Sequence, residues 1–481
     1  MTDFTASVPA TPSRNHWLAA LLVASGIVLG GGGSAAPLPE MLLQCTAALI
    51  AAALMLSPGG PAALARADRR AWIVAALIVV LPLVQLVPLP PALWQRLPGR
   101  ELEAASLALV GASGRWMPWS LSPSRTFASL LVMLPTAALV PLVASLGGRG
   151  RALVVTTIAV MAVLALIVGT GQISGGGTVG GGGGNSLRFY VPEARFLNGF
   201  QANHNSSADM LMIGMVALVA ALREWLESPG SGPNGARRRQ VSPALALSAA
   251  GFTALLFSLA VFLSGSRAGM VLLPVPLLAV AVIAWPWLRT IGFPGRRIGA
   301  RDMAMALVAA LFAGLLAAWL LRGNGAVARI AARYDFAGEG RPEIWRDALY
   351  AMQQYFPFGS GMGTFAPVFD AAERLEAVAW SRTGRAHNDV LELAIEGGAF
   401  GLALMSVIAA MLANAARRAW NSGHHASRPQ ILFALAALAV IALHSQVDYP
   451  LRSMALGFVG AACAGLLMPL PWGRNRVSKH A

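Results

Sequence analysis

The residues best suited to chemistry lie between positions 341 and 401. This stretch begins RPEIWRDALYAMQQYFPFGSGMGTF and ends RAHNDVLELAIEGGAFG, and it is rich in charged side chains although the chain as a whole has few. It leads directly into an apolar segment long enough to be a membrane helix. Ionisable groups at the mouth of a membrane helix are costly to place there and usually serve a function, so this stretch is a candidate active site.

Arginine dominates the candidate residues. A guanidinium group stays charged at any relevant pH and matches phosphate oxygens in bidentate fashion. A histidine beside such groups can accept a proton near neutral pH. The set therefore indicates an anion-binding cluster with a general base, and it suits a pyrophosphate better than a neutral solute. Its members are Arg195, Asn203, Asn205, Arg267, Arg341, Arg346, Arg385, His387, Asp389, Glu392, His444, Asp448 and Arg452.

His387 is the candidate base. If the apolar segment is helical from this point, His387 heads a face of small and apolar residues that is well suited to packing inward. Glu392 and Glu396 point to other faces and are expected to pair with arginines of neighbouring helices. An incidental hydrogen bond at the start of a helix is the alternative role for the histidine. The members of the small-residue face are Leu391, Ala394, Gly398 and Gly401.

Two short connections contribute further candidates. Arg267 lies in SGSRAG, which offers almost no loop to carry the side chain into water. A charged residue at that depth usually faces a protein interior or a cavity, and an arginine that reaches the interface by its long stem is the alternative. His444, Asp448 and Arg452 are spaced by four, which would bring them to one side of a helix, but Pro450 interrupts the run.

Composition predicts the elements that position these residues. The chain has 481 residues, of which 56% are hydrophobic and 12% charged, whereas soluble domains carry about 25% charged residues. Repeated apolar runs of about 20 residues match a hydrocarbon layer of ~30 Å. The sequence therefore predicts an all-α polytopic membrane protein.

Twelve candidate spans follow from the apolar runs, within a single integral domain of residues 1–481. They cover residues 17–33, 38–56, 71–88, 126–146, 152–171, 207–226, 243–263, 269–288, 303–321, 388–414, 431–443 and 451–470. Arginines gather in the loops after even-numbered spans, and the positive-inside rule places these loops and both termini in the cytoplasm. The odd-numbered loops are then outside. The largest of them, residues 322–386 between spans nine and ten, is predicted to be periplasmic.

Other kinds of site are disfavoured. The net charge is +15, but the arginines lie in short loops between apolar spans, which argues against nucleic acid as a partner. Cys45 and Cys463 have no metal-ligand spacing, and no metal site is predicted elsewhere. Residues 175–184 are almost all glycine but lack the GK[ST] ending of a phosphate-binding loop, which favours a flexible connector. Ser206 with Asp209 resembles a capping box that opens span six.

Four segments carry a family resemblance. In order, they are NGFQANHNSSAD, SGSRAG, RPEIWRDAL with FPFGSGMGTF, and RAHNDVLELAIEGGAFG. Together they make the chain similar to the O-antigen ligase and polymerase superfamily of bacterial membrane glycosyltransferases, over roughly residues 195–448. The resemblance implies a fold like that of type-C glycosyltransferases. It also implies that Arg267 and Arg341 hold a pyrophosphate and that His387 is the essential histidine. Gln201 departs from the apolar or aromatic residue expected there.

The resemblance also implies a reaction. The donor would be a glycan on undecaprenyl pyrophosphate, used at the periplasmic face of the bacterial inner membrane among its lipids, with no metal and no other cofactor. Supporting roles are expected for Arg195, Asn203, Asn205, Arg385, Glu392 and Asp448. The acceptor separates a ligase acting on lipid A core for lipopolysaccharide, a polysaccharide polymerase acting on another lipid-linked glycan, and a protein O-oligosaccharyltransferase.

A transporter, such as a lipid-linked glycan flippase, is the alternative from another class. Transporters place polar groups near the middle of the membrane in repeated halves. Here the polar groups gather at the predicted outer mouth of the spans and the two halves show no likeness. The residues therefore favour an enzyme over a transporter.

Overall fold

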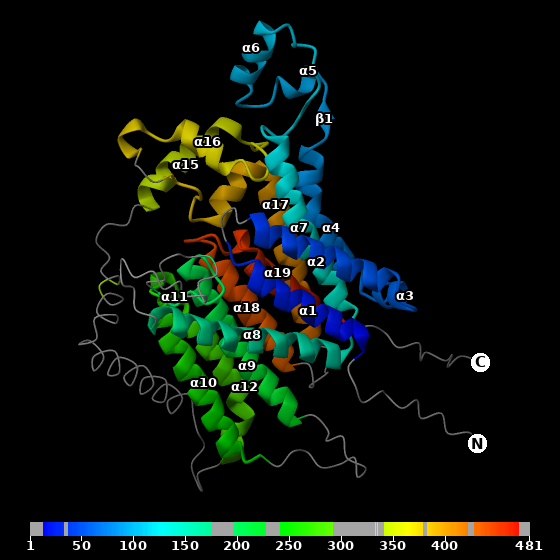
Figure 1. Ribbon diagram of the computed structural model, residues 1–481, viewed down its shortest axis with the longest axis vertical. Coiled ribbons are helices and arrows are strands. Elements are labelled where there is room, and N and C mark those ends of the chain that lie inside the picture. Colours follow the sequence, from blue (N-terminus) through cyan, green and yellow to red (C-terminus); the bar gives the residue numbers. More distant parts are fainter. Residues whose placement is uncertain are drawn as a thin grey trace.

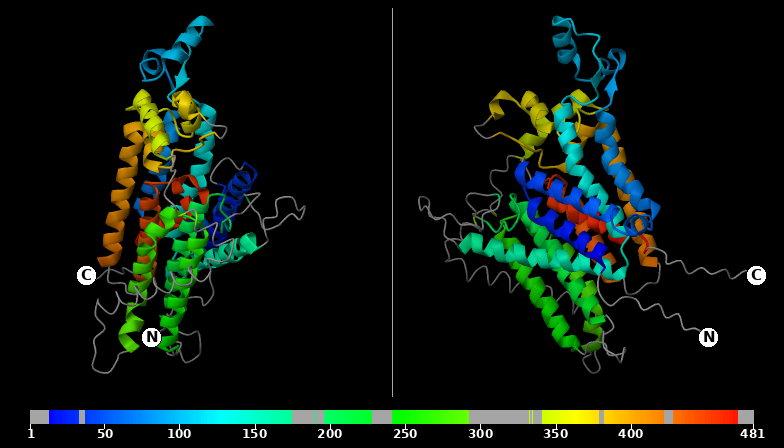
Figure 2. Two further views of the ribbon diagram at one scale, coloured as in Figure 1. Left: turned by 90° about the vertical axis from the view of Figure 1, so that its left-hand side faces the viewer. Right: turned by 45° about the vertical axis from the view of Figure 1, so that its right-hand side comes forward.

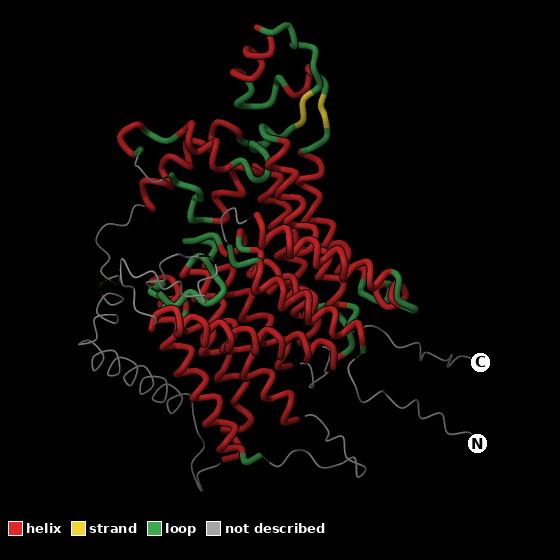
Figure 3. The backbone as a smooth tube through the Cα atoms, viewed as in Figure 1, coloured by secondary structure: helices red, strands yellow, loops and turns green. Residues whose placement is uncertain are grey.

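The computed structural model describes residues 13–32, 37–174, 190, 196–227, 241–291, 332, 334, 341–378, 382–421 and 428–470. This part of the chain is almost entirely helical (Figure 3). Its two described strands, β1 (Pro88–Leu89) and β2 (Met117–Pro118), form one antiparallel pair. The helices of the first half are α1 (Arg14–Leu29), α2 (Pro37–Met55), α3 (Gly60–Leu64), α4 (Arg69–Gln85), α5 (Pro91–Trp94), α6 (Glu101–Leu109), α7 (Pro123–Ala144), α8 (Gly148–Ser174) and α9 (His204–Glu227).

The second half continues with helices and two short 3₁₀ turns. These elements are α10 (Pro243–Leu263), α11 (Arg267–Leu272), α12 (Pro274–Ile291), α15 (Arg341–Tyr355), α16 (Phe365–Ala372), η2 (Leu375–Ala377), α17 (Asp389–Asn421), α18 (Arg428–His444), η4 (Pro450–Arg452) and α19 (Met454–Leu467). Helices that satisfy their own backbone groups are what an apolar bilayer requires of a spanning segment.

Seven helical spans among the described residues are long and apolar enough to cross a membrane, with α11 and α12 together forming one of them, and α1, α18 and α19 are shorter apolar helices. The class predicted from composition, an all-α polytopic membrane protein, is therefore confirmed. Helices occupy eleven of the twelve predicted segments, the eighth being divided between α11 and α12. The ninth, residues 303–321, lies outside the described residues. The number of twelve spans, the side of each loop and the place of both termini stay predictions.

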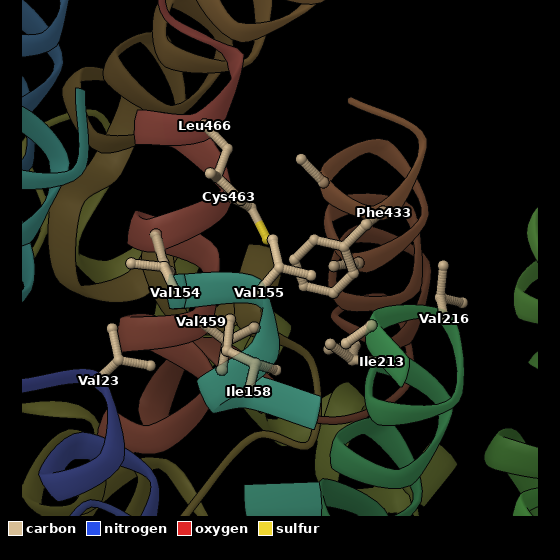
Figure 4. Packing of buried hydrophobic residues seen from close by; sticks show 14 of the residues in the cluster. Val23, Val154, Val155, Ile158, Ile213, Val216, Phe433, Val459, Cys463 and Leu466 are labelled. Carbon is tan, nitrogen blue, oxygen red and sulfur yellow. The ribbon is translucent and has the colours of Figure 1, made fainter. Parts of the chain in front are cut away.

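The helices pack into one bundle in which α18 and α19 lie between two groups (Figure 1). One group contains α9, α10 and α12, and the other contains α4, α7 and α17. Valine, isoleucine, leucine and phenylalanine side chains fill the space between α8, α9, α18 and α19 (Figure 4). Small residues allow close approach, because a Cβ at Gly465 of α19 would lie only 2.7 Å from the Cβ of Val143 on α7.

A smaller region stands beyond the ends of α4 and α7. The β1–β2 pair, α5 and α6 project furthest from the bundle, and α15 and α16 lie beside the first turns of α17 (Figures 1 and 2). The described part of the predicted loop 322–386 is therefore largely helical. Its own apolar cluster includes Ala348, Phe365 and Ile395, and it anchors α15 and α16 to α17.

A bend in α17 shapes this region. Gly398 has a φ of 57°, which glycine adopts without steric cost, and a side chain there would collide with the carbonyl oxygen of Pro357. The backbone of the FPFGSGMGTF segment is bonded across the bend, with Ser360 N donating to Ile395 O at 2.9 Å and Ala399 N donating to Pro357 O at 2.8 Å. The backbone of this motif thus holds the first turns of α17 in place.

Candidate active site

His387 lies just before α17 and not within it. Its φ of 50° places it in the left-handed region, which few residues other than glycine adopt. α17 begins at Asp389, after Asn388 has capped it by accepting a hydrogen bond from Leu391 N at 3.0 Å. The prediction that His387 heads the small-residue face of a helix is therefore wrong, because its backbone conformation takes it out of helical register.

A buried carboxylate holds the His387 ring. Nδ1 of His387 lies 3.0 Å from Oδ1 of Asp448, and Asn203 Nδ2 donates to Oδ2 of the same carboxylate at 3.3 Å. The Asp448 side chain is 2% exposed, whereas that of His387 is 33% exposed. With Nδ1–H directed at the carboxylate, Nε2 is left as the proton acceptor of the ring. Tyr449 packs edge-on against the ring, with centroids 5.0 Å apart.

The surroundings set the ionisation of Asp448 and Tyr449. Burial opposes ionisation of Asp448, but the hydrogen bond from His387 and the charges of His387, His444 and Arg341 outweigh it, so the pKa of Asp448 lies below its ordinary value. Burial, with the nearby charge of Asp448, raises the pKa of Tyr449 to about 12. At neutral pH the site therefore presents an ionised carboxylate behind the histidine and a protonated phenol beside it.

Arg341 is the first residue of α15 and lies close to this pair. Its charge acts on Asp448. About one turn further along α15, Trp345 Nε1 donates to the carbonyl oxygen of Ala386 at 3.0 Å, which ties this end of the helix to the histidine segment. The structure thus brings the end of α15 that carries Arg341 beside His387.

Arg267 is half-buried at the start of α11. Ser266 caps this helix by accepting a hydrogen bond from Gly269 N at 3.0 Å. α11 packs against α9 and α18, and a Cβ at Gly269 would lie 2.7 Å from the Cβ of Ala208 on α9. Arg267 therefore lies at the end of the bundle where α18 leads into the loop that carries Asp448.

Glu392 and Glu396 pair with arginines, but these arginines lie in the loop before α17 and in the η4 turn rather than in neighbouring α-helices. Glu392 Oε1 lies 2.9 Å from Arg385 NH1 and 3.2 Å from Arg452 Nε, and Glu396 Oε2 lies 2.8 Å from Arg452 NH1. Both carboxylates are fully buried. Glu392 also accepts a hydrogen bond from Ala386 N at 3.2 Å. Arg385 and Glu392 thus belong to a charged network that holds the backbone next to His387.

The remaining predicted residues have different outcomes. Asn205 is buried at the start of α9, and its backbone N–H donates to Oδ1 of Asn203 at 2.9 Å. Gln201 is buried and accepts a hydrogen bond from Ser453 Oγ at 3.3 Å. Arg195 and the glycine run 175–184 lie outside the described residues.

The predicted capping box at Ser206 and Asp209 is wrong. α9 begins at His204, so that Ser206 is already inside the helix. Asp209 pairs instead with His444, Oδ1 to Nδ1 at 2.6 Å. The only local sign of this role was a carboxylate inside an otherwise apolar span. Within the described residues, no group of three or more His, Cys, Asp or Glu side chains is arranged to hold a metal ion.

Comparison with protein families gives a match over about a third of the chain. Residues 252–406 match the family model described as O-antigen ligase. A comparison with curated proteins finds no match. The matched stretch contains Arg267, Arg341 and His387, whereas Asn203 and Asp448, which hold the histidine, lie outside it.

Proposed function

From the premise that this chain belongs to the O-antigen ligase and polymerase superfamily, we propose that it transfers a glycan from undecaprenyl pyrophosphate to an acceptor hydroxyl. We propose further that the protein is multi-pass in the bacterial inner membrane, with both termini cytoplasmic and the site at the periplasmic face. The arginine distribution supports this orientation. Membership in a family of glycosyl-transferring enzymes supports an enzyme over a flippase.

The His387–Asp448 pair carries the proposal. Nε2 of His387 accepts the proton of the acceptor hydroxyl while the hydroxyl oxygen attacks the anomeric carbon of the donor sugar. The bond between that carbon and the pyrophosphate oxygen breaks, and undecaprenyl pyrophosphate leaves with the bonding electrons. One displacement inverts the configuration at the anomeric carbon. The ionised carboxylate of Asp448, 3.0 Å from Nδ1, stabilises the imidazolium that forms.

Arg267 and Arg341 are proposed to hold the pyrophosphate. Guanidinium groups directed at the leaving oxygens stabilise negative charge as it develops there, which is the role a metal ion has in many phosphate-dependent enzymes. We therefore propose a metal-independent reaction. Their positions support this role. Each arginine is the first residue of a helix, and it lies next to the segments that carry His387 and Asp448.

A transfer assay with purified protein tests the proposal. The protein in lipid nanodiscs is given a defined undecaprenyl-pyrophosphate-linked glycan with lipid A core, a second lipid-linked glycan or an acceptor protein. Transfer to one of these without a membrane gradient is expected, and the productive acceptor distinguishes ligase, polymerase and protein glycosylation. We expect lipid A core or a lipid-linked glycan to be the productive acceptor.

Two variants complete this assay. His387→Ala should abolish transfer. His16→Ala is the matched control, because His16 lies at the start of α1 and bonds only the backbone of Ser13 among the hydrogen bonds described, at 3.1 Å. Transfer by His387→Ala at a rate close to that of the control would exclude the histidine as the base.

A further inference from the structure

His444 and Asp209 form a second histidine–carboxylate pair, separate from the His387–Asp448 pair. Nδ1 of His444, the last residue of α18, is 2.6 Å from Oδ1 of Asp209 in α9. The two side chains are 0% and 1% exposed. Within the described residues, His444 Nε2 and Asp209 Oδ2 have no hydrogen-bond partner. Burial of such groups is costly, so the pair needs an explanation beyond packing.

The pair is one of two side-chain contacts between the same two segments. Asn203, at the start of α9, bonds Asp448 at 3.3 Å, and Asp209, six residues further on, bonds His444. α9 packs against α18 (Figure 1), and the loop after α18 runs from the His444 contact to the Asp448 contact. The start of α9 is thus joined at two points to the end of α18 and the loop after it.

Backbone hydrogen bonds connect the His444–Asp209 contact to the Asp448–Asn203 contact. The carbonyl oxygen of His444 accepts hydrogen bonds from Val447 N at 3.0 Å and from Asp448 N at 2.8 Å. The position of His444 therefore sets where the backbone of Asp448 lies. Asp448 in turn bonds Nδ1 of His387. A continuous series of contacts runs from Asp209 through His444 and Asp448 to the proposed base.

We propose that Asp209 and His444 are positioning residues for glycan transfer, which keep the Asp448 carboxylate aligned with His387. This inference rests on the proposed function. Full burial separates the pair from substrate, so it acts through Asp448. A misplacement of about 1 Å in a reacting group can cost on the order of 10²-fold in rate, which is the effect expected when the pair is lost.

The test replaces both partners together. Asp209→Val with His444→Leu removes the pair and leaves no buried charge, a change that proteins often tolerate in stability. The double variant should fold, keep the KM for the donor within about threefold and lose about 10²-fold in kcat. Asp209→Asn, which still accepts a hydrogen bond from His444, should keep most of the activity. Thr253→Val is the control, since the hydroxyl of buried Thr253 donates to Ala249 O of its own helix at 2.9 Å.

A double-mutant cycle separates positioning from general stability. In an Asp448→Ala background the same double variant should lose no more than about threefold further, because the residue through which it acts is gone. An equal loss in both backgrounds, or an unchanged kcat in the wild-type background, would overturn the inference. If the Asp209→Val, His444→Leu double variant does not fold, the cycle is run with His444→Gln instead. An equal loss of kcat in both backgrounds, or an unchanged kcat in the wild-type background, would again overturn the inference.

The inference and the proposed function fail in different ways. If wild-type protein transfers no glycan to any acceptor, the function is wrong and the inference loses its basis. If wild-type protein is active, His387→Ala is inactive and the double variant is as fast as wild type, only the positioning role is wrong.

Discussion

Asp448→Asn should slow transfer strongly while leaving the protein folded. Asparagine keeps the shape of the side chain but carries no charge, and its single carbonyl oxygen cannot accept hydrogen bonds from both Asn203 and His387, as the two carboxylate oxygens do. The carboxylate lies 3.0 Å from Nδ1 of His387. Its proposed role is to stabilise the imidazolium that forms when the acceptor is deprotonated, so the substitution removes an interaction that strengthens in the transition state.

The size of the effect follows from the geometry. Opposite unit charges whose centres are ~4 Å apart interact by about 4 kcal/mol at an effective dielectric constant of ~20. The His387 side chain is 33% exposed, and if solvent screens half of this energy, roughly 2 kcal/mol remains. At 1.36 kcal/mol for each factor of ten, kcat should fall between roughly 30-fold and 10³-fold.

The assay is transfer of a labelled glycan by purified protein, with kcat and the donor KM measured separately. Asp370→Asn is the matched control, because Asp370 forms an exposed ion pair with Arg382 in the same outer region. The control should change kcat less than twofold, as expected for a surface pair. If Asp448→Asn retains as much activity as Asp370→Asn, the carboxylate does not assist His387 and the proposed chemistry of the pair is refuted.

Three further predictions concern the charges around the site. Arg341→Lys should lower kcat/KM for the donor at least tenfold, because a point charge cannot reproduce the two parallel hydrogen bonds of a guanidinium; a normal value would argue against a pyrophosphate clamp. Arg452→Met should destabilise the protein by about 3–5 kcal/mol, since it removes the arginine that pairs with the buried Glu396 and leaves Glu392 paired with Arg385 alone, and a thermal midpoint equal to that of wild type would contradict this. The pKa of Asp448 lies below its ordinary value of 3.8, so its ionised form stabilises the fold above about pH 4 and this contribution is lost as the pH falls further. The difference in thermal midpoint between wild type and Asp448→Asn should therefore shrink below pH 4. A difference that grows below pH 4 would contradict a lowered pKa of Asp448.

Much of the fold was predictable because hydropathy is a local property. The span predicted at residues 243–263 coincides with α10, Pro243–Leu263. The candidate arginines and His387 were proposed on similarly local grounds, because charged residues beside apolar spans are few and their types suit a pyrophosphate; their roles stay predictions. Glu392 and Glu396 were expected to pair with arginines for the same reason, and they do.

The rest depends on contacts between distant parts of the chain. The left-handed backbone of His387 and the bend at Gly398 have no periodic signature, because each is held by a partner segment. Asp209 and His444 are 235 residues apart. In sequence, Asp209 resembles a helix cap three residues after a serine, and only the packing of α9 against α18 reveals its partner.

The origin of the contacts around His387 limits what a family match can say about this site. The matched stretch, residues 252–406, holds the proposed base and both proposed pyrophosphate ligands. The carboxylate that bonds the base comes from the loop after α18, and the amide that bonds this carboxylate comes from the start of α9. A histidine without its carboxylate loses both its fixed tautomer and the charge that stabilises its protonated form. The proposed reactive unit is therefore assembled from segments at the ends of α9, α11, α15, α17 and α18, and we expect a difference in rate between relatives with identical matched stretches to arise from the residues near α9 and α18.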